Sequence, residues 1–305
     1  MIRTHTEAPS APAQYVLAEI ASQPEMWSRA AEVAAIHAAA LPQQQERVAV
    51  VGCGTSWFVA QAYAGYREQA GLGETDAFAA SEFPAGRRYD LVMAITRSGT
   101  TTEVLDLLAR LPSEQRTLIV VGDPDSPGAR AADHAVLLPF ADEKSVAQTR
   151  FATTTLSVLR AALGEDLVRV IDDCRAALVR PLPTGWQQKV QFTFLGRGPA
   201  VGLAHEAALK MREAAIAWAE SYPAQEYRHG PIAVAEKHSL VWILGDAPAG
   251  LPAEIKATGA ALENSELDPM ADLVRVQRLA VEVALHRGYD PDSPRNLRRS
   301  IILEP

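Results

Sequence analysis

The sequence has little of several things that specialised proteins need. Only two of its 305 residues are cysteine, Cys53 and Cys174, too few for a disulfide scaffold and typical of a reducing compartment. No uninterrupted apolar run approaches the roughly 18 residues that a membrane helix requires. Residues 1–10 contain no apolar segment of the kind that signal peptides carry. We therefore expect a cytoplasmic protein.

Basic residues are also fewer than acidic ones. Lys and Arg number 29 against 37 Asp and Glu, so the formal net charge is −8. Such a chain does not present a broad surface to nucleic acid or to an anionic membrane, and we expect neither as a partner. The seven histidines are scattered and the two cysteines lie far apart, so we expect no metal site and no cofactor.

What the sequence does contain is an alternation of short apolar runs and helical patterns. Strands that lack internal polar alternation are typical of a parallel sheet covered by helices on both faces. Helical spacing predicts two helices between residues 14 and 41, with a break at Pro24. Two later helices are expected to end near residues 70 and 111, and two more to span 152–163 and 271–286. The predicted strands are 47–51, 91–95, 117–121, 135–138, 190–195 and 240–245.

Pro181, Pro183 and Gly185 form the clearest linker in the chain. The strand after the linker ends in a Gly-x-Gly turn, and so does the strand at 47–51. We interpret this repeated strand-and-turn pattern as an internal duplication that gives two α/β lobes. The second lobe looks shortened, with little room for strands after 240–245. The expected organisation is an N-terminal tail with helices over 1–42, a first domain over 43–180 and a second domain over 186–305.

The first glycine-rich turn, Gly52-Cys-Gly-Thr-Ser56, follows a strand and opens a helix. Its backbone amides lie at the positive end of the helix and two hydroxyls add donors, which makes an anion site. Trp57 stands where a dinucleotide motif has its third glycine, and the lysine of a P-loop is absent. A single phosphate therefore fits better than a nucleotide, although a tight turn with a helix cap explains this motif equally well by itself.

A second hydroxyl cluster, Ser98 with the threonines at 100–102, also lies between a strand and a helix. The carboxyl ends of neighbouring parallel strands meet in one crevice. Helix capping needs only one hydroxyl, so two converging clusters favour a phosphate site in the first lobe. The matching turn of the second lobe, residues 196–199, has no hydroxyl.

Glu206, Lys210 and Glu213 recur at helical spacing and project from one face. They form either a surface ladder of ion pairs or a general base beside a cation. His229, just before a Gly-Pro turn, is either a solvated side chain or an acid–base group. Spacing alone leaves both alternatives open.

Seven stretches, in this order along the chain, together resemble the sugar isomerase (SIS) family, most closely the isomerase half of glucosamine-6-phosphate synthase. The synthase's glutamine-hydrolysing domain has no counterpart in these residues. The stretches are Gly52-Cys-Gly-Thr-Ser56, Ser98-Gly-Thr-Thr101, Ala147-Gln-Thr-Arg-Phe-Ala-Thr-Thr-Thr-Leu156, Phe194-Leu-Gly-Arg-Gly198, Glu206-Ala-Ala-Leu-Lys-Met-Arg-Glu213, Glu226-Tyr-Arg-His-Gly-Pro231 and Asp292-Ser-Pro-Arg-Asn-Leu297.

The resemblance implies two SIS lobes, a homodimer with active sites near the interface, and a hexose or hexosamine 6-phosphate as substrate. Glu213 matches the base that moves a proton between C1 and C2, and Lys210 matches a lysine near the substrate. His229 matches a ring-opening histidine that the neighbouring subunit supplies. The resemblance assigns phosphate binding to Ser56, Ser98 and Thr101 with Thr96 and Arg97 in the same loop, and further substrate contacts to Gly54, Thr55 and Arg299.

The chain departs from the synthase pattern at three of these positions. Thr96 and Arg97 replace a serine and a glutamine, and Arg299 stands where the synthase has a Schiff-base lysine. A guanidinium stays protonated and is a poor nucleophile. The sequence therefore favours an aldose–ketose isomerase or deaminase that uses Glu213 to remove the C2 proton.

Two alternatives stay open from the sequence. One is a lyase that dehydrates N-acetylglucosamine 6-phosphate, because the same base can start an elimination. The other is a phosphosugar sensor without catalysis. Sensors of this kind need an output module, and the sequence contains no basic recognition helix.

Overall fold

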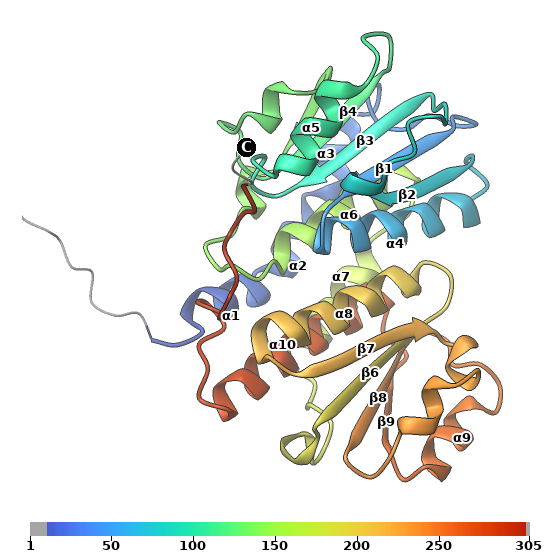
Figure 1. Cartoon of the computed structure of the whole chain (residues 1–305), viewed down its shortest axis with the longest axis vertical. Coiled ribbons are helices and arrows are strands. Elements are labelled where there is room, and N and C mark those ends of the chain that lie inside the picture. The colour runs from blue at the N-terminus through green and yellow to red at the C-terminus, as the bar shows by residue number, and fades with distance from the viewer. Residues whose placement is uncertain (1–10, 303–305) are drawn as a thin grey trace, which may run out of the picture.

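The computed structural model describes residues 11–302, and its framework is two parallel β-sheets (Figure 1). The first sheet has five strands in the order β2-β1-β3-β4-β5, with every neighbouring pair parallel. Its central strands are completely buried, as their apolar runs predict. The strands are β1 Val48–Gly52, β2 Thr75–Ala79, β3 Leu91–Thr96, β4 Thr117–Val121 and β5 His134–Leu137.

The second sheet has four parallel strands in the order β7-β6-β8-β9. They are β6 Gln191–Gly196, β7 Trp218–Pro223, β8 Ser239–Leu244 and β9 Ala261–Asn264. The predicted fold, two α/β lobes of which the second is smaller, is therefore confirmed. The division at residues 180 and 186 stays a prediction.

The expectation of little room for strands after 240–245 was wrong. The strand β9 forms there, and β7 and β2 were also missed. All three are edge strands, and most of their residues are only half-buried. An edge strand does not need a continuous apolar run, so it gives little signal in the sequence.

The segment before the first sheet forms three short helices rather than the two predicted: α1 Gln14–Ala21, α2 Gln23–Ser28 and α3 Ala30–Ile36. Pro24 lies in the first turn of α2, where its missing N–H costs nothing. The break in the helical pattern is therefore at Ser22, with a second at Arg29. Residues 1–10 of the predicted N-terminal tail lie outside the described residues.

The remaining helices cover the faces of both sheets. They are α4 Thr55–Gln69, α5 Thr102–Arg110, α6 Arg150–Ala162, α7 Val168–Val179, α8 Ala200–Ala215, α9 Leu251–Ala257 and α10 Pro269–His286. Short 3₁₀ turns lie at Ala80–Glu82, Gly128–Arg130, Pro139–Ala141, Trp186–Gln188, Glu226–Arg228 and Pro231–Val234. Within residues 11–302, none of the helices combines the length and the apolar character needed to cross a membrane.

Helices α4 and α8 pack against each other between the two sheets (Figure 1). The contact is close at Gly202 of α8, where a Cβ atom would lie 2.5 Å from the backbone oxygen of Phe58 and from the backbone nitrogen of Ala62. One continuous hydrophobic core joins the lobes, with members such as Ala60 from α4 and Ala204 from α8. The amino-terminal half of α8 is thereby held against the first lobe.

The C-terminal segment, residues 287–302, leaves α10, passes α1 and ends beside α5 (Figure 1). Its Asp292 accepts hydrogen bonds from the backbone N–H groups of Tyr15 and Val16, both at 2.8 Å. A carboxylate at the start of a helix satisfies N–H groups that have no partner within the helix. Asp292 therefore fixes the segment's path where it passes α1.

Candidate functional site

The two hydroxyl clusters of the first lobe meet in one crevice at the carboxyl ends of β1 and β3. These strands flank the point where the strand order reverses, which is where open α/β sheets bind ligands. The crevice has a volume of about 170 Å³. Its lining residues are Cys53, Gly54, Thr55, Ser56, Ile95, Thr96, Arg97, Ser98, Thr101, Glu103, Val146, Gln148, Glu213 and residues 297–301.

The turn after β1 is shaped by its glycines. Gly54 has a φ of 54°, a conformation that favours glycine. A Cβ atom on Gly52 would lie 2.7 Å from the backbone carbon of Ser56, so the turn can only close this tightly without one. The chain passes from this loop directly into α4, and Ser56 lies in the first turn of that helix. Free backbone N–H groups and the positive helix end attract an anion there.

The turn after β3 holds its hydroxyls together by hydrogen bonds among themselves. The Oγ1 atoms of Thr96 and Thr101 lie 3.2 Å apart, and the backbone N–H of Gly99 donates to Thr96 Oγ1 at 3.3 Å. The Thr100 hydroxyl donates to Ser98 Oγ at 3.0 Å. The predicted cluster is therefore real, and its groups converge at the start of α5.

The C-terminal segment reaches into this second hydroxyl cluster. Ser300 Oγ lies 3.1 Å from Ser98 Oγ and 2.7 Å from Thr100 Oγ1. The backbone N–H of Thr102 donates to the carbonyl of Ile301 at 3.4 Å. Polar groups of the chain itself thus contact the hydroxyls and the helix end that the sequence assigns to phosphate.

Arg97 lies in the wall of the crevice but is only 1% exposed. Its guanidinium donates to the backbone carbonyl of Ser145 at 2.9 Å and to that of Arg299 at 2.8 Å. Burial lowers the pKa of Arg97, although Glu143 and other nearby carboxylates oppose this. The structure shows Arg97 joining two backbone segments across the crevice, and its predicted contact with phosphate stays a prediction.

Arg299 also has a partner within the chain. Its guanidinium donates to both carboxylate oxygens of Asp142, at 2.6 and 2.7 Å. The pair is partly exposed, so solvent screens it and it adds little to stability. It connects the C-terminal segment to the loop that follows β5.

The predicted face of α8 places Lys210 between two carboxylates. Lys210 Nζ lies 2.5 Å from Glu213 Oε2 and 3.4 Å from Glu206 Oε1. It also donates to Thr55 Oγ1 at 3.1 Å, and Thr55 donates in turn to Glu206 at 3.2 Å. The side chains of Glu206 and Lys210 are 2% exposed whereas that of Glu213 is 21% exposed, which excludes the surface-ladder alternative. Only Glu213 of the three lines the crevice.

Burial makes the proton equilibria of this cluster unusual. Desolvation raises the pKa of Glu206 to about 7, although Lys210 opposes the shift. Desolvation also disfavours the charged form of Lys210, but the carboxylates of Glu206 and Glu213 outweigh it and its pKa is raised. Lys210 therefore stays a cation next to Glu213, while Glu206 changes its charge near neutral pH.

His229 lies away from the crevice. It follows the 3₁₀ turn Glu226–Arg228 in the second lobe, is exposed, and is not one of the residues that line the crevice. The expectation that it serves the site of a neighbouring subunit stays a prediction.

Sequence reasoning missed several residues of the crevice wall. Gln148 lay within one of the quoted stretches but received no role, and Glu103 gave no signal beyond its place in the first turn of a helix. Ser300 and Ile301 follow the last matching stretch and carry no motif of their own. Their proximity depends on the path of the C-terminal segment, which local patterns do not encode.

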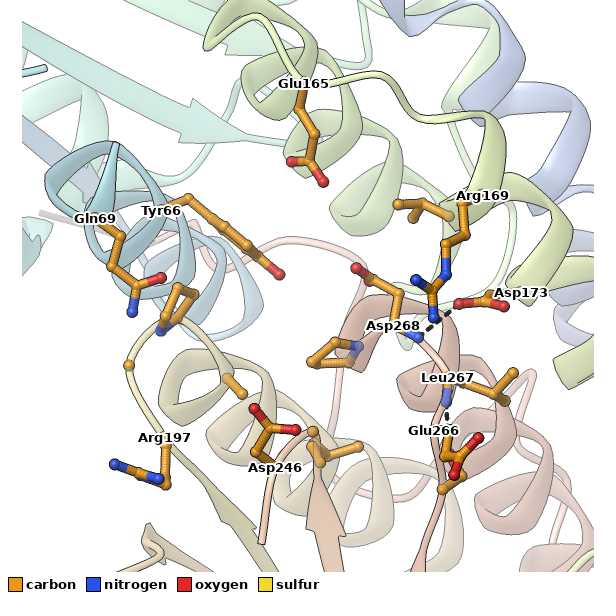
Figure 2. Close-up of a pocket in the computed structure, with 18 of the residues that line it drawn as sticks. Tyr66, Gln69, Glu165, Arg169, Asp173, Arg197, Asp246, Glu266, Leu267 and Asp268 are labelled. Atoms are coloured by element: carbon orange, nitrogen blue, oxygen red, sulfur yellow. Dashed lines mark hydrogen bonds between the residues drawn. The ribbon is translucent and has the colours of Figure 1, made fainter. Parts of the chain in front are cut away.

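A larger cavity, of about 690 Å³, lies between the lobes at the carboxyl ends of β6 and β8. Figure 2 shows Arg197 and Asp246 at these strand ends, with Tyr66 of α4 and Arg169 of α7 opposite. It includes none of the predicted site residues, and its turn at 196–199 has no hydroxyl. Among residues 11–302, no group of three or more His, Cys, Asp or Glu side chains is arranged to hold a metal ion.

Sequence comparison connects the chain to a known domain. Residues 43–164 match the SIS domain. The chain is 29% identical over 296 residues to the glutamine–fructose-6-phosphate aminotransferase (isomerizing) of Sulfurisphaera tokodaii, with 85% of this chain and 50% of the relative covered. It is 31% identical over 307 residues to the enzyme of the same name from Methanothermobacter thermautotrophicus, with 85% and 52% covered. The chain thus spans about half the length of these curated relatives.

Solved structures share the fold over almost the whole chain. The C-terminal domain of glucosamine-fructose-6-phosphate aminotransferase from Francisella tularensis has a TM-score of 0.80 at 23% identity, covering 94% of this chain and 100% of that one. Tagatose-6-phosphate ketose/aldose isomerase from Escherichia coli has a TM-score of 0.80 at 21% identity, covering 98% and 99%. Glucosamine-6-phosphate deaminase from Thermotoga maritima has 0.77 at 23%, covering 93% and 100%. At these identities the likeness establishes the two-lobed fold.

Proposed function

Since residues 43–164 of this chain are a SIS domain, we propose that the protein is an enzyme that processes a hexosamine or ketohexose 6-phosphate. The reaction is an aldose–ketose isomerisation or the deaminating form of it. One observation carries the proposal: Glu213, from the second lobe, lines the same crevice as the hydroxyl clusters of the first lobe. A base and an anion site therefore face one small volume.

The phosphate of the substrate binds where the two helix ends converge. Ser56 in the first turn of α4 and Ser98 and Thr101 before α5 offer hydroxyl donors, and the helix ends offer backbone N–H groups. Gly54 lets the backbone approach the ligand, since it carries no side chain. The Thr55 hydroxyl is already engaged by Glu206 and Lys210, so its part is to join the anion site to the cluster on α8.

Glu213 is the base. Its carboxylate removes the proton from C2 of the open-chain aldose, which leaves an enediolate. A proton moves from O2 to O1, and Glu213 returns its proton to C1 to give the ketose. The ammonium of Lys210 lies 2.5 Å from this carboxylate and forms an ion pair with it. Burial of Lys210 behind Glu213 keeps the ammonium in place as an electrostatic partner. Positioned acid–base groups of this kind contribute about 10²–10⁴-fold to a rate.

The deaminating reaction uses the same first step. Removal of the C2 proton from a 2-amino aldose gives an enolamine, and protonation at C1 turns it into an imine at C2. Water then adds to C2, and the C2–N bond breaks to release ammonia and the ketose. No Schiff base with the protein is needed, which agrees with an arginine at position 299.

His229 opens the sugar ring in this proposal, and a second copy of the chain supplies it. Its exposure on the second lobe is compatible with donation to a neighbouring subunit in a homodimer. The complementation experiment in the Discussion tests this part.

Proton NMR in D₂O tests the reaction. The purified chain is incubated with fructose 6-phosphate, glucosamine 6-phosphate or N-acetylglucosamine 6-phosphate. We expect deuterium at C1 or C2 together with ketose–aldose exchange or ammonia release. A vinylic signal would instead identify a dehydratase, and tight binding without exchange would identify a sensor.

Two variants make the test specific for the base. Glu213→Gln removes the base but keeps the size of the side chain, and we expect a rate loss of roughly 10²-fold or more. Glu282→Gln, at an exposed position of α10, is the matched control and leaves the rate unchanged. Full activity of Glu213→Gln would remove Glu213 as the base.

A further inference from the structure

The wall of the crevice contains oxygen atoms that the protein leaves without hydrogen bonds. Glu103 and Gln148 both line the crevice. The Oε2 atom of Glu103 and the Oε1 atom of Gln148 are buried and have no hydrogen-bond partner. Nearly all buried polar atoms of native proteins are paired, so an unpaired one calls for an explanation. Both atoms are acceptors, and a ligand with donors would satisfy them.

Gln148 is held in position by its surroundings. Glu143 Oε1 accepts from the backbone N–H of Thr149 at 2.7 Å and from that of Arg150 at 2.8 Å. On the other side of Gln148, Arg97 donates to the carbonyl of Ser145 at 2.9 Å. Buried charged groups thus fix the backbone on both sides of Gln148. Its unpaired carbonyl therefore belongs to an ordered wall, as in sites that are organised before the ligand arrives.

Glu103 adds a negative charge that the chain does not neutralise nearby. It lies in the first turn of α5, and none of the ion pairs within residues 11–302 includes it. Cys53, in the turn after β1, is close enough to respond to it. Burial first, and then the charge of Glu103, raise the pKa of the Cys53 thiol to about 11. Glu103 therefore lines the crevice without an ion-pair partner among residues 11–302.

An unpaired carboxylate disfavours a ligand that brings only negative charge. A sugar phosphate that carries an ammonium group compensates for this, since its cation can lie against Glu103 while its phosphate lies at the helix ends. An ammonium has three N–H donors, enough for both unpaired acceptors, whereas a hydroxyl has one and no charge. Hydrogen bonds between charged groups are also about twice as strong as neutral ones.

We propose that Glu103 and Gln148 are the specificity residues of this site and select a sugar phosphate with a free ammonium group over one with a hydroxyl or an acetamido group at the same carbon. This inference rests on the proposed function, because it places the sugar in the crevice of Glu213. It assigns roles to two side chains that take no part in the proton transfer.

Calorimetric titration of the full chain tests the selection. The ligands are inorganic phosphate, glucose 6-phosphate, glucosamine 6-phosphate and N-acetylglucosamine 6-phosphate, at about pH 6.5 so that the amine is protonated. We expect the wild type to bind the ammonium sugar roughly 10- to 100-fold more tightly than the hydroxyl sugar. Equal affinity for these two sugars would overturn the inference. Failure to bind phosphate and every sugar phosphate would instead overturn the proposed function.

Variants assign the selection to the two residues. Glu103→Gln, which keeps the size but removes the charge, should bring the preference to within about threefold, since the charged hydrogen bond is lost. Phosphate should bind at least as tightly as to wild type, because the repulsion by the carboxylate is removed. Glu103→Asp keeps the charge and should retain part of the preference. Gln148→Leu should weaken the binding of the ammonium sugar roughly fivefold and leave the binding of phosphate almost unchanged.

Glu114→Gln is the control, because Glu114 is an exposed glutamate outside the crevice. A preference that survives both Glu103→Gln and Gln148→Leu would place the recognition elsewhere and refute the assignment. Thermal melting of each variant shows whether it is folded before its affinity is compared.

Discussion

Single residues of the crevice combine several tasks, and Thr55 shows this most clearly. Its backbone begins α4 at the anion site, and its hydroxyl is bound to Glu206 and Lys210 of the other lobe. Ser56 next to it is buried and lines the crevice. In the proposed function, neighbouring hydroxyls therefore have different tasks: that of Thr55 connects the lobes and that of Ser56 binds the phosphate.

The phosphate assignment predicts a loss of affinity for the Ser56→Ala, Thr101→Ala double variant. Each lost hydrogen bond to a charged oxygen costs about 1.5–3 kcal/mol, so affinity for a sugar phosphate should fall by roughly 10²-fold or more. Calorimetric titration measures this, with Ser113→Ala at an exposed loop as the control. Unchanged binding would refute the assignment.

The raised pKa of Glu206 predicts that the stability of the protein depends on pH. Burial raises its pKa in the folded protein from 4.5 to about 7, so between these values the folded state keeps a proton that the unfolded chain has lost. Stability therefore falls as the pH rises through this window. Each pH unit between the two pKa values changes the free energy of unfolding by about 1.4 kcal/mol. Over the whole window the wild type therefore loses about 3 kcal/mol of unfolding free energy that a Glu206→Gln variant keeps.

Denaturant unfolding at about pH 4.5 and pH 8 checks this expectation. The free energy of unfolding of Glu206→Gln should rise relative to wild type between the two conditions, whereas the exposed Glu282→Gln should follow wild type. A difference between Glu206→Gln and wild type that does not change with pH would show that Glu206 titrates normally.

Among the elements, the C-terminal segment has the largest effect on the site. Leu297 and Ile301 line the crevice, Ser300 contacts the hydroxyl cluster, and the Arg299 carbonyl accepts from Arg97. The segment therefore lines the crevice and also engages the hydroxyls that the proposed function assigns to phosphate. If phosphate binds there as proposed, it has to break or rearrange some of these contacts.

Removing the contact should tighten phosphate binding. In Ser300→Ala the hydroxyls of Ser98 and Thr100 are no longer engaged by the segment, and affinity for inorganic phosphate should rise roughly 2- to 10-fold, the equivalent of one ordinary hydrogen bond. Ser293→Ala, exposed in the same segment, should leave the affinity unchanged. Weaker phosphate binding by Ser300→Ala would show instead that the serine helps to hold the ligand.

For the whole molecule, the question is whether one chain contains a complete site. Glu213 lines the crevice and His229 does not, so the proposed mechanism needs a second copy arranged with closed two-fold symmetry. The lobes themselves are joined by a continuous core and by the close contact of α4 and α8 at Gly202. The single chain therefore holds the proposed base and the proposed anion site in place, and the proposed mechanism takes the ring-opening group from a partner.

Mixing two inactive variants tests this arrangement. Glu213→Gln and His229→Asn are unfolded and refolded together, so that half of the dimers contain one subunit of each. Every such dimer has one site with both native residues, and the mixture should recover about a quarter of the wild-type rate. Each variant refolded alone is the control. A mixture no more active than the controls would place His229 outside the neighbour's site.

The sequence by itself determined the two parallel sheets, the glycine turn after β1 and the hydroxyl cluster after β3. It also put Glu206, Lys210 and Glu213 on one face of α8. These features follow from local chemistry, because buried strands need apolar runs and a helix repeats every 3.6 residues. Each is readable within a window of a few residues.

The tertiary structure decided everything that depends on burial by distant segments. Ser300 meets Ser98 across about 200 residues of chain. Glu206 acquires its raised pKa only through burial in the folded chain, although the hydrogen bond from Thr55 opposes the shift. The edge strands β2, β7 and β9 exist because a neighbour offers hydrogen bonds, since their own residues are only partly apolar. The unpaired oxygens of Glu103 and Gln148 likewise arise from packing, because the same side chains in an unfolded chain would bind water.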